Sequence, residues 1–125
     1  MNENEIGREV LAAAMTLHTE LGPGLLESTY QVCFSHELKR HALGVREQVS
    51  IPIRYRELMI ENGYRIDLLV NECVVIELKS IEAILPVHRG QLLSYLRLGR
   101  FKLGYLLNFN VAHMRDGITR LVNGL

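Results

Sequence analysis

The residues best suited to chemistry stand in two apolar runs near the middle of the chain. Asp67 lies within Arg-Ile-Asp-Leu-Leu-Val, and Glu77 and Lys79 follow within Val-Ile-Glu-Leu-Lys. Charged side chains are rarely left unpaired in such runs, because removing an ion from water costs several kcal/mol even after relaxation. Two carboxylates and the carbonyl of Leu78 are hard oxygen ligands of the kind that Mg²⁺ or Mn²⁺ prefers. We therefore expect a divalent cation to compensate these charges.

The two carboxylates meet in only one register of a hairpin. Direct pairing of Asp67 with Glu77 centres the hairpin on Glu72, so the connection must be a three-residue loop or contain a bulge. A two-residue Asn71-Glu72 turn would place the carboxylates on opposite faces, and we predict the odd loop or bulge. Lys79 shares the face of Glu77, because strand residues alternate between faces. There its ammonium could position a water that attacks phosphorus and stabilise charge in the transition state.

Apolar periodicity predicts the helices that surround these residues. Spacings of three and four residues indicate a helix over 4–21 stopped by Gly22-Pro23-Gly24, and a second over 25–41 stopped by Gly44. A third, over 87–98, begins after Pro86 and ends at Gly99. The side chains expected to face the core are Ile6, Val10, Ala13, Ala14, Leu17, Leu21, Leu26, Tyr30, Cys33, Phe34, Leu38, Val87, Leu92, Leu93 and Leu96, with Tyr95 as an additional candidate.

The strands show a period of two. Residues 45–54 alternate and contain Pro52, which cannot donate to a ladder, so this strand should lie at a sheet edge. Residues 58–60, 65–70 and 73–79 should continue an antiparallel meander, with Glu61-Asn62-Gly63 as a turn. Residues 101–108 are apolar enough for a strand buried on both faces. After a turn at Asp116-Gly117, residues 118–122 should form a short closing strand. This order describes an α/β domain with a mixed central sheet.

Composition narrows the function classes. The 125 residues are 48% hydrophobic and 22% charged, which fits one domain over 1–125. Fourteen basic and fourteen acidic residues balance, so a nucleic acid or other anionic partner would have to be held locally. No apolar run approaches the roughly 18 residues of a membrane span, and the acidic start is unlike a signal peptide. We expect a cytoplasmic protein without a membrane partner, in which Cys33 and Cys73 are buried free thiols.

Several further motifs together indicate a family. Gly24-Leu25-Leu26-Glu27-Ser28-Thr29-Tyr30 reads G-x-x-E-x-x-Y, and it precedes Asp67, Glu77-Leu78-Lys79 and Gln91-Leu92-Leu93-Ser94-Tyr95. With this ordered set the chain resembles the GxxExxY family, which is grouped with the PD-(D/E)XK nuclease-like superfamily. The resemblance covers roughly residues 6–122 and implies a restriction-endonuclease-like core, a mixed central sheet flanked by helices. One departure is that Asp67 follows Arg-Ile rather than the proline of the superfamily's name.

The resemblance implies a role for each motif residue. Asp67 and Glu77 match the metal-binding carboxylates and Lys79 the catalytic lysine. Glu27 matches the helix glutamate that completes the metal shell directly or through water. Gln91 and Tyr95 match a Q-x-x-x-Y element that lines the site, and their i, i+4 spacing puts them on one helix face. The implied metal ligands are thus Asp67, Glu77, Leu78 and Glu27.

These assignments predict an Mg²⁺- or Mn²⁺-dependent nuclease that hydrolyses phosphodiester bonds of DNA or RNA by metal-activated water. The alternative is a non-catalytic module of the same fold that binds a protein partner or nucleic acid. The neutral charge and the small size support this alternative, because they leave no separate domain for gripping a substrate. A third possibility is a nuclease subunit that needs a second copy or another protein to hold the substrate, and we expect a homodimer.

Structural interpretations of the same residues stay open. Asp67, Glu77 and Lys79 could form a buried salt-bridge network without metal, and Glu27 could complement the helix dipole. Gln91 and Tyr95 could be helix surface and core. Tyr30 is expected to be a packing residue with a tethered hydroxyl. His88 is either structural or in contact with the scissile phosphate. The basic residues around the end of the third helix either guide a phosphate backbone or solvate the surface; they are Arg97, Arg100 and Lys102.

Overall fold

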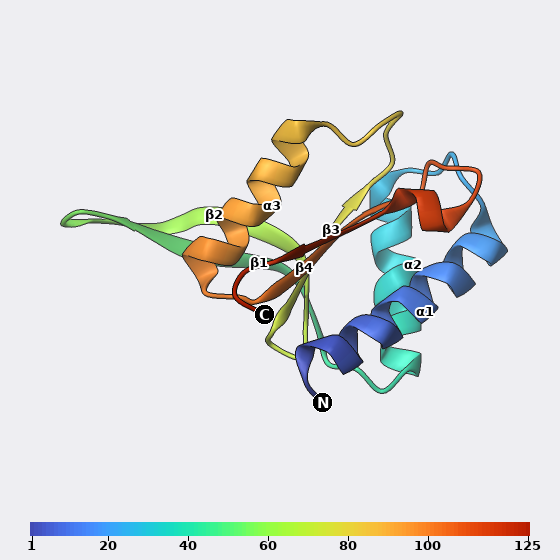
Figure 1. Cartoon of the computed structure of the whole chain (residues 1–125), viewed down its shortest axis with the longest axis horizontal. Helices are drawn as coiled ribbons and strands as arrows, with labels where there is room; N and C mark the ends of the chain where they lie inside the picture. Colours follow the sequence, from blue (N-terminus) through green and yellow to red (C-terminus); the bar gives the residue numbers. More distant parts are fainter.

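A five-stranded sheet separates two helical layers (Figure 1). The computed structural model describes all 125 residues. The strands, in their spatial order, are β1 (Val45–Tyr55), β2 (Leu58–Val70), β3 (Val74–Lys79), β4 (Leu103–Asn108) and β5 (Ile118–Val122). The helices are α1 (Glu3–Leu21), α2 (Glu27–Arg40), α3 (Pro86–Gly99) and the short 3₁₀ helix η1 (Met114–Gly117).

The sheet is mixed, as predicted. Strands β1, β2 and β3 form an antiparallel meander, and β4 pairs antiparallel with β5. Strands β3 and β4 are parallel, and α3 makes the crossover that a parallel pair requires. Strand β1 lies at an edge, which agrees with Pro52, and β4 is buried along its whole length, as its apolar sequence predicted.

Two hydrophobic cores fix the helices against the sheet. The larger core joins α1 and α2 to one face of the sheet, and the smaller core joins α3 to the other face. Leu92 and Leu96 carry α3 into the smaller core. Helix α1 begins with a capping box between Asn2 and Glu5 and ends at Gly22, whose φ of 68° favours glycine. None of the helices combines the length and the apolar character that crossing a bilayer requires.

Several details of the predicted helices are wrong. Leu26 and Val87 were expected to face the core but are 73% and 69% exposed, because they lie at the helix N-termini, beyond the edge of the packed face. Leu21 and Leu93 are also exposed, and Cys33 and Cys73 are free but half-buried. Gly44 does not end α2: the chain turns at Ala42, which has a φ of 62°.

The predicted turn at Glu61-Asn62-Gly63 is also wrong. Strand β2 runs unbroken through this segment, and the reversal from β1 occurs at Arg56, which has a φ of 53°. Glycine is needed at position 63 for packing instead, because any Cβ there would overlap the side chain of Ile53. The rest of the meander and the closing strand β5 agree with the sequence pattern.

Candidate active site

The β2–β3 hairpin has the odd connection that the sequence predicted. Residues 71–73 form a three-residue loop, with left-handed φ values of 50° at Asn71 and 59° at Glu72. The ladder pairs Leu68 with Ile76 and Val70 with Val74. Continued by one residue, this register sets Asp67 directly opposite Glu77.

Strands β2 and β3 stop pairing through their main chains at Asp67. Its main-chain N–H donates to Glu77 Oε1 over 3.2 Å, and the N–H of Leu78 donates to Asp67 Oδ2 over 2.8 Å. On the other side of β2, the β1 ladder omits Asp67 and Gln48, and Gln48 has a φ of 52°. Main-chain N–H groups of both strands thus donate to carboxylates at this point, which brings both acidic groups together where the ladder ends.

The alternation of β2 side chains breaks at the same point. Ile66 and Leu69 both pack in the smaller core, although a spacing of three residues normally reverses the face of a strand. Leu68 packs in the larger core. The change of face lies at Asp67, between the segment of β2 that packs with α3 and the segment covered by α1 and α2.

Burial disfavours two negative charges on this acidic pair. Glu77 is only 6% exposed, and desolvation, followed by repulsion from Asp67, raises its pKa to about 9. A divalent cation fits here, because its charge would offset both effects and Mg²⁺ is bound in proteins through one or two carboxylates while it keeps several waters.

Lys79 follows Glu77 on the same face of β3. Its side chain is half-buried and forms no ion pair, yet its charge acts on Glu77 by lowering the pKa of that carboxyl, against the larger effects of burial and Asp67. A free ammonium is therefore available beside the acidic pair. The backbone of Lys79 is held in place, because its carbonyl accepts from the N–H of Phe109 over 3.0 Å.

Glu27 is linked to this region through Ser80. Its Oε2 accepts from the N–H of Ser80 over 3.3 Å, and Ser80 Oγ donates to the carbonyl of Leu25 over 2.6 Å. The start of α2 is thereby fastened to the end of β3. No three His, Cys, Asp or Glu side chains lie together in a group that could hold a metal ion, so Glu27 does not form a three-carboxylate cluster with Asp67 and Glu77. Its role as a metal ligand, like that of the Leu78 carbonyl, stays a prediction.

The last residue of the G-x-x-E-x-x-Y motif has the packing role that was expected. Tyr30 is fully buried and stacks on Phe109, with ring centroids 4.7 Å apart. Its hydroxyl donates to the carbonyl of Gly22 over 2.6 Å and accepts from the N–H of Leu25 over 3.2 Å. Tyr30 thus fixes the loop that leads into Glu27.

Helix α3 brings Tyr95 close to the acidic pair. Burial, together with the charges of Glu77 and Asp67, raises the pKa of Tyr95. Its ring stacks on Tyr64 with a centroid distance of 4.3 Å and an interplanar angle of 12°, and the Tyr64 hydroxyl donates to the carbonyl of Tyr95 over 2.9 Å. Gln91, one turn earlier, is exposed and its side chain makes no hydrogen bond within the chain, so its role also stays a prediction.

Sequence reasoning missed two residues that shape this region. Tyr64 was missed because residues 61–63 were interpreted as a turn; a continuous strand would have placed it, two residues before Ile66, on the same face of β2. Asn108 ends β4, and its side chain accepts from the N–H of Ile81 over 3.1 Å and donates to the Ile81 carbonyl over 3.0 Å. It therefore holds the segment after Lys79 in place, through a contact that no local sequence pattern predicts.

His88 and the basic residues at and just after the end of α3 form no hydrogen bond or ion pair with the other candidate site residues. His88 Nδ1 accepts from the N–H of Leu85 over 2.9 Å, which caps α3 and favours the structural interpretation. His88 also lines a cavity of about 390 Å³, next to the end of β3, whose other lining residues are Ile81, Glu82, Ala83 and Leu85. Arg97, Arg100 and Lys102 are exposed and form no ion pairs.

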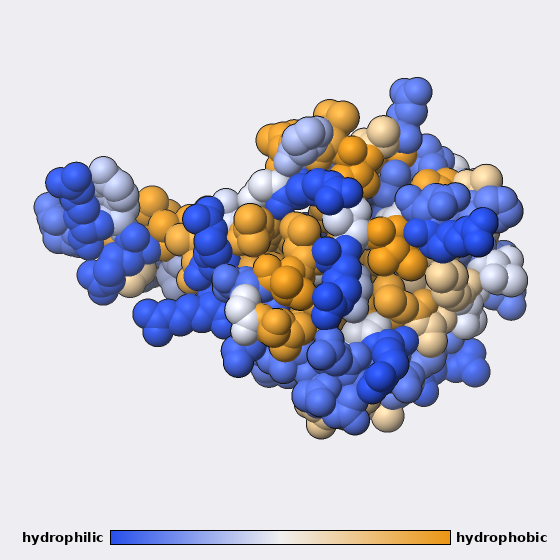
Figure 2. All heavy atoms as spheres, viewed as in Figure 1, coloured by the Kyte–Doolittle hydropathy of each residue, from blue (hydrophilic) through white to orange (hydrophobic).

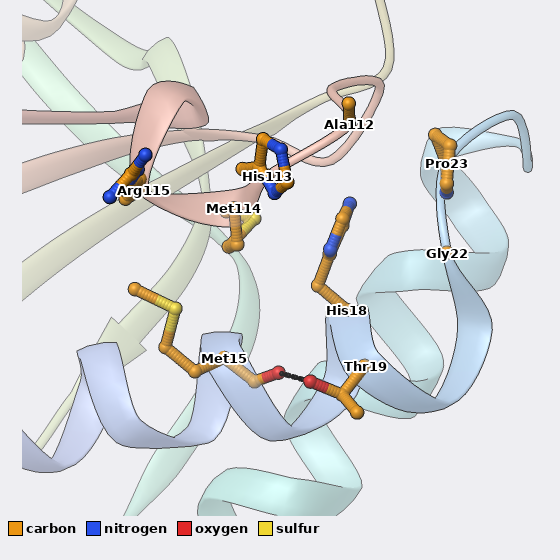
Figure 3. A pocket seen from close by; sticks show the side chains of 9 residues that line it. All are labelled: Met15, His18, Thr19, Gly22, Pro23, Ala112, His113, Met114 and Arg115. Atoms are coloured by element: carbon orange, nitrogen blue, oxygen red, sulfur yellow. Dashed lines mark hydrogen bonds between the residues drawn. The ribbon is translucent and has the colours of Figure 1, made fainter.

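The largest cavity lies elsewhere. It measures about 690 Å³ and lies between the end of α1 and the segment around η1 (Figure 3). His18 and His113 line it, and His18 Nε2 donates to the carbonyl of Val111 over 2.8 Å. None of the predicted site residues lines this cavity.

Comparison with known proteins gives one match. A family model described as the PD-(D/E)XK nuclease superfamily matches residues 4–121. Searches of curated proteins and of solved structures gave no match. The matched range contains every residue of the candidate site, from Glu27 to Tyr95.

Proposed function

This chain belongs to the PD-(D/E)XK nuclease superfamily, and from that premise we propose that it hydrolyses phosphodiester bonds of DNA or RNA with a divalent metal ion. The observation that carries the proposal is the buried contact between Asp67 and Glu77, with the free ammonium of Lys79 on the same strand. Lys79 forms no ion pair with either carboxylate, so its ammonium is free to act on a bound substrate.

Asp67 and Glu77 are the residues that would hold the metal, Mg²⁺ or Mn²⁺, with the Leu78 carbonyl and Glu27 as further candidate ligands. When bound, such an ion neutralises charge on the phosphate and makes water a better nucleophile at neutral pH. The protein's own contribution is to keep both carboxylates fixed in a poorly hydrated position, through the N–H groups of Asp67 and Leu78.

Lys79 has a separate task in this proposal. Its ammonium orients the attacking water and stabilises the negative charge that grows on the phosphate oxygens in the transition state. The Tyr95 hydroxyl and the Gln91 amide lie on one face of α3 and are the groups that would orient the substrate. Because the chain has no net charge, these local groups supply the attraction for the nucleic acid.

A nuclease assay with matched controls tests this function. Single- and double-stranded DNA and RNA are incubated with the protein and Mg²⁺ or Mn²⁺. The variants Asp67→Asn and Lys79→Ala should each reduce cleavage by about 100-fold or more, the usual effect of removing such groups. The controls Asp116→Asn and Lys39→Ala remove an exposed residue of the same type and should cleave like the wild type.

Other results would change the assignment. Cleavage that survives both Asp67→Asn and Lys79→Ala would belong to a contaminant. Folded protein that binds an oligonucleotide without cleaving it, in either metal, would support the non-catalytic binding module instead.

A further inference from the structure

The hairpin between β1 and β2 extends beyond the rest of the sheet. Residues 51–64, here called the arm, pair only with each other, because β3 joins β2 from Leu68 to Val70 only. In Figure 1 the arm projects from the body of the protein as a long two-stranded ribbon. A two-stranded hairpin is at best marginally stable in water, so a ribbon of this length needs a surface to pack against.

One face of the arm is apolar. Ile53 pairs with Ile60 and Tyr55 with Leu58, so these four side chains share a face, here called the stripe. Ile53 packs against the smaller core, while Tyr55, Leu58 and Ile60 are 61%, 57% and 43% exposed. Figure 2 shows apolar side chains on the projecting part behind a hydrophilic tip. The stripe thus continues a core outward into solvent, which is typical of a protein contact surface.

The β1 edge of the arm is not suited to adding a further strand. Pro52 lacks a donor, and the register between β1 and β2 shifts between Ile51 and Ile53. Both features protect an edge strand against pairing with another chain. A partner should therefore pack on the stripe through side chains.

The charges of the arm favour a second copy of this chain. Arg54 and Arg56 are matched in number by Glu57 and Glu61, all exposed. With two charges of each sign, the arm has no net positive charge to attract nucleic acid, whereas a copy related by a two-fold axis presents an identical stripe together with both signs of charge. The formal net charge of zero also removes any overall repulsion between copies.

We propose that the arm is a dimerisation element, in which the stripes of two copies of this chain pack against each other in an isologous contact. This inference does not depend on the nuclease function. It assigns a role to residues that the candidate active site leaves unused.

Leu58 and Met59, which are neighbours on opposite faces of the arm, provide the test of this dimer contact. Leu58 lies in the stripe, while Met59 pairs with Arg54 on the other face and is similarly exposed, at 45%. Light scattering during gel filtration and sedimentation equilibrium should show a dimer of the full chain. Leu58→Lys should raise the dimer dissociation constant at least about tenfold, since it removes apolar burial from both copies. Met59→Lys should leave that constant within about twofold.

Far-UV circular dichroism and thermal unfolding of both variants establish that each one folds. A wild-type chain that stays monomeric up to about 100 μM would overturn the proposal. So would a dimer that Leu58→Lys leaves intact, because the contact would then lie on another surface. Equal weakening by both substitutions would equally contradict it, since the effect would not be specific to the stripe.

Discussion

Asp67 donates its main-chain N–H to the carboxylate of Glu77, so one acidic residue of the pair holds the other in place. The carboxylate of Asp67 is in turn held by the N–H of Leu78. The two acidic groups are therefore positioned by the hairpin itself, before any ligand binds. Their proximity and burial keep a proton on Glu77, and the predictions about stability and metal binding follow from that proton.

The first prediction concerns the pH dependence of stability. The pKa of Glu77 is raised from 4.5 to about 9 in the folded protein, mainly by burial and then by Asp67. The folded chain therefore keeps a proton that the unfolded chain releases. The contribution of Glu77 to the free energy of unfolding is full below pH 4.5, and it is lost progressively as the pH rises to about 9.

Glu77→Gln should remove this dependence, because glutamine resembles the protonated acid and stays neutral. At pH 8 without metal, the variant should unfold about 3 °C or more above the wild type, and the difference should shrink toward pH 5. Thermal unfolding at several pH values measures this, with Glu47→Gln on the exposed part of β1 as the control. A difference independent of pH would show that Glu77 is ionised in the folded chain.

The second prediction concerns metal binding. Carboxylates must be ionised to bind a cation, so Mn²⁺ should displace about one proton from Glu77 near neutral pH. Calorimetric titrations in two buffers of different ionisation enthalpy count that proton, and the affinity should rise with pH. Asp67→Asn should weaken binding at least about tenfold, and Asp116→Asn should not.

Glu27→Gln distinguishes a ligand from a structural residue. A weakening of Mn²⁺ binding comparable to that of Asp67→Asn would support direct coordination. An unchanged affinity would limit Glu27 to its contact with Ser80. Binding of Mn²⁺ without proton release would contradict the protonated state of Glu77.

The third prediction compares two glycines near the candidate site. A Cβ at Gly117 would overlap the main-chain oxygen of Asn108, the residue that holds Ile81 after the end of β3. Gly117→Ala should therefore lower the free energy of unfolding by about 2 kcal/mol or more. Gly90 lies within α3 with open space around its Cβ position, so Gly90→Ala should stabilise the protein by about 0.5–1 kcal/mol. Urea unfolding measures the free energy of unfolding of both variants. An unchanged free energy in Gly117→Ala would show that β4 and η1 can move apart at little cost.

The sequence was informative where a local rule determines the structure. The pairing of Asp67 with Glu77 was predictable because only an odd loop puts them on one face, and the loop over residues 71–73 has that length. Pro52 predicted the edge position of β1 because a missing N–H excludes a central strand. Tyr30 was recognised as a packing residue because a buried phenol needs a hydrogen-bond partner.

Contacts between distant parts of the chain were not predictable in this way. Gly63 resembled a turn residue, but the side chain that requires its missing Cβ, that of Ile53, lies on another strand. The change of face at Asp67 lies opposite Gln48 of β1, whose left-handed backbone leaves no mark in the sequence pattern. The position of Glu27 relative to the acidic pair depends on how α2 packs, and the helical period fixes only which face of α2 is buried.

The last prediction concerns Tyr64 as the residue that positions Tyr95. Tyr64→Phe removes only the hydrogen bond to the Tyr95 carbonyl and should cost about 1 kcal/mol of unfolding free energy. Tyr64→Leu also removes the stacked ring and should cost about 2–3 kcal/mol. With Tyr64→Leu, Tyr95 becomes more hydrated, so its raised pKa should fall toward the ordinary value of 10.

Spectrophotometric titration of tyrosine ionisation follows this shift, with Tyr95→Phe identifying the Tyr95 signal and Tyr55→Leu on the exposed arm as the control. Mn²⁺ affinity should stay unchanged in Tyr64→Leu, because Asp67 and Glu77 keep their main-chain donors. If Tyr64 positions Tyr95 for catalysis, cleavage should fall in Tyr64→Leu and largely persist in Tyr64→Phe. A Tyr95 pKa that does not move in Tyr64→Leu would mean that α3 holds Tyr95 beside the carboxylates without Tyr64.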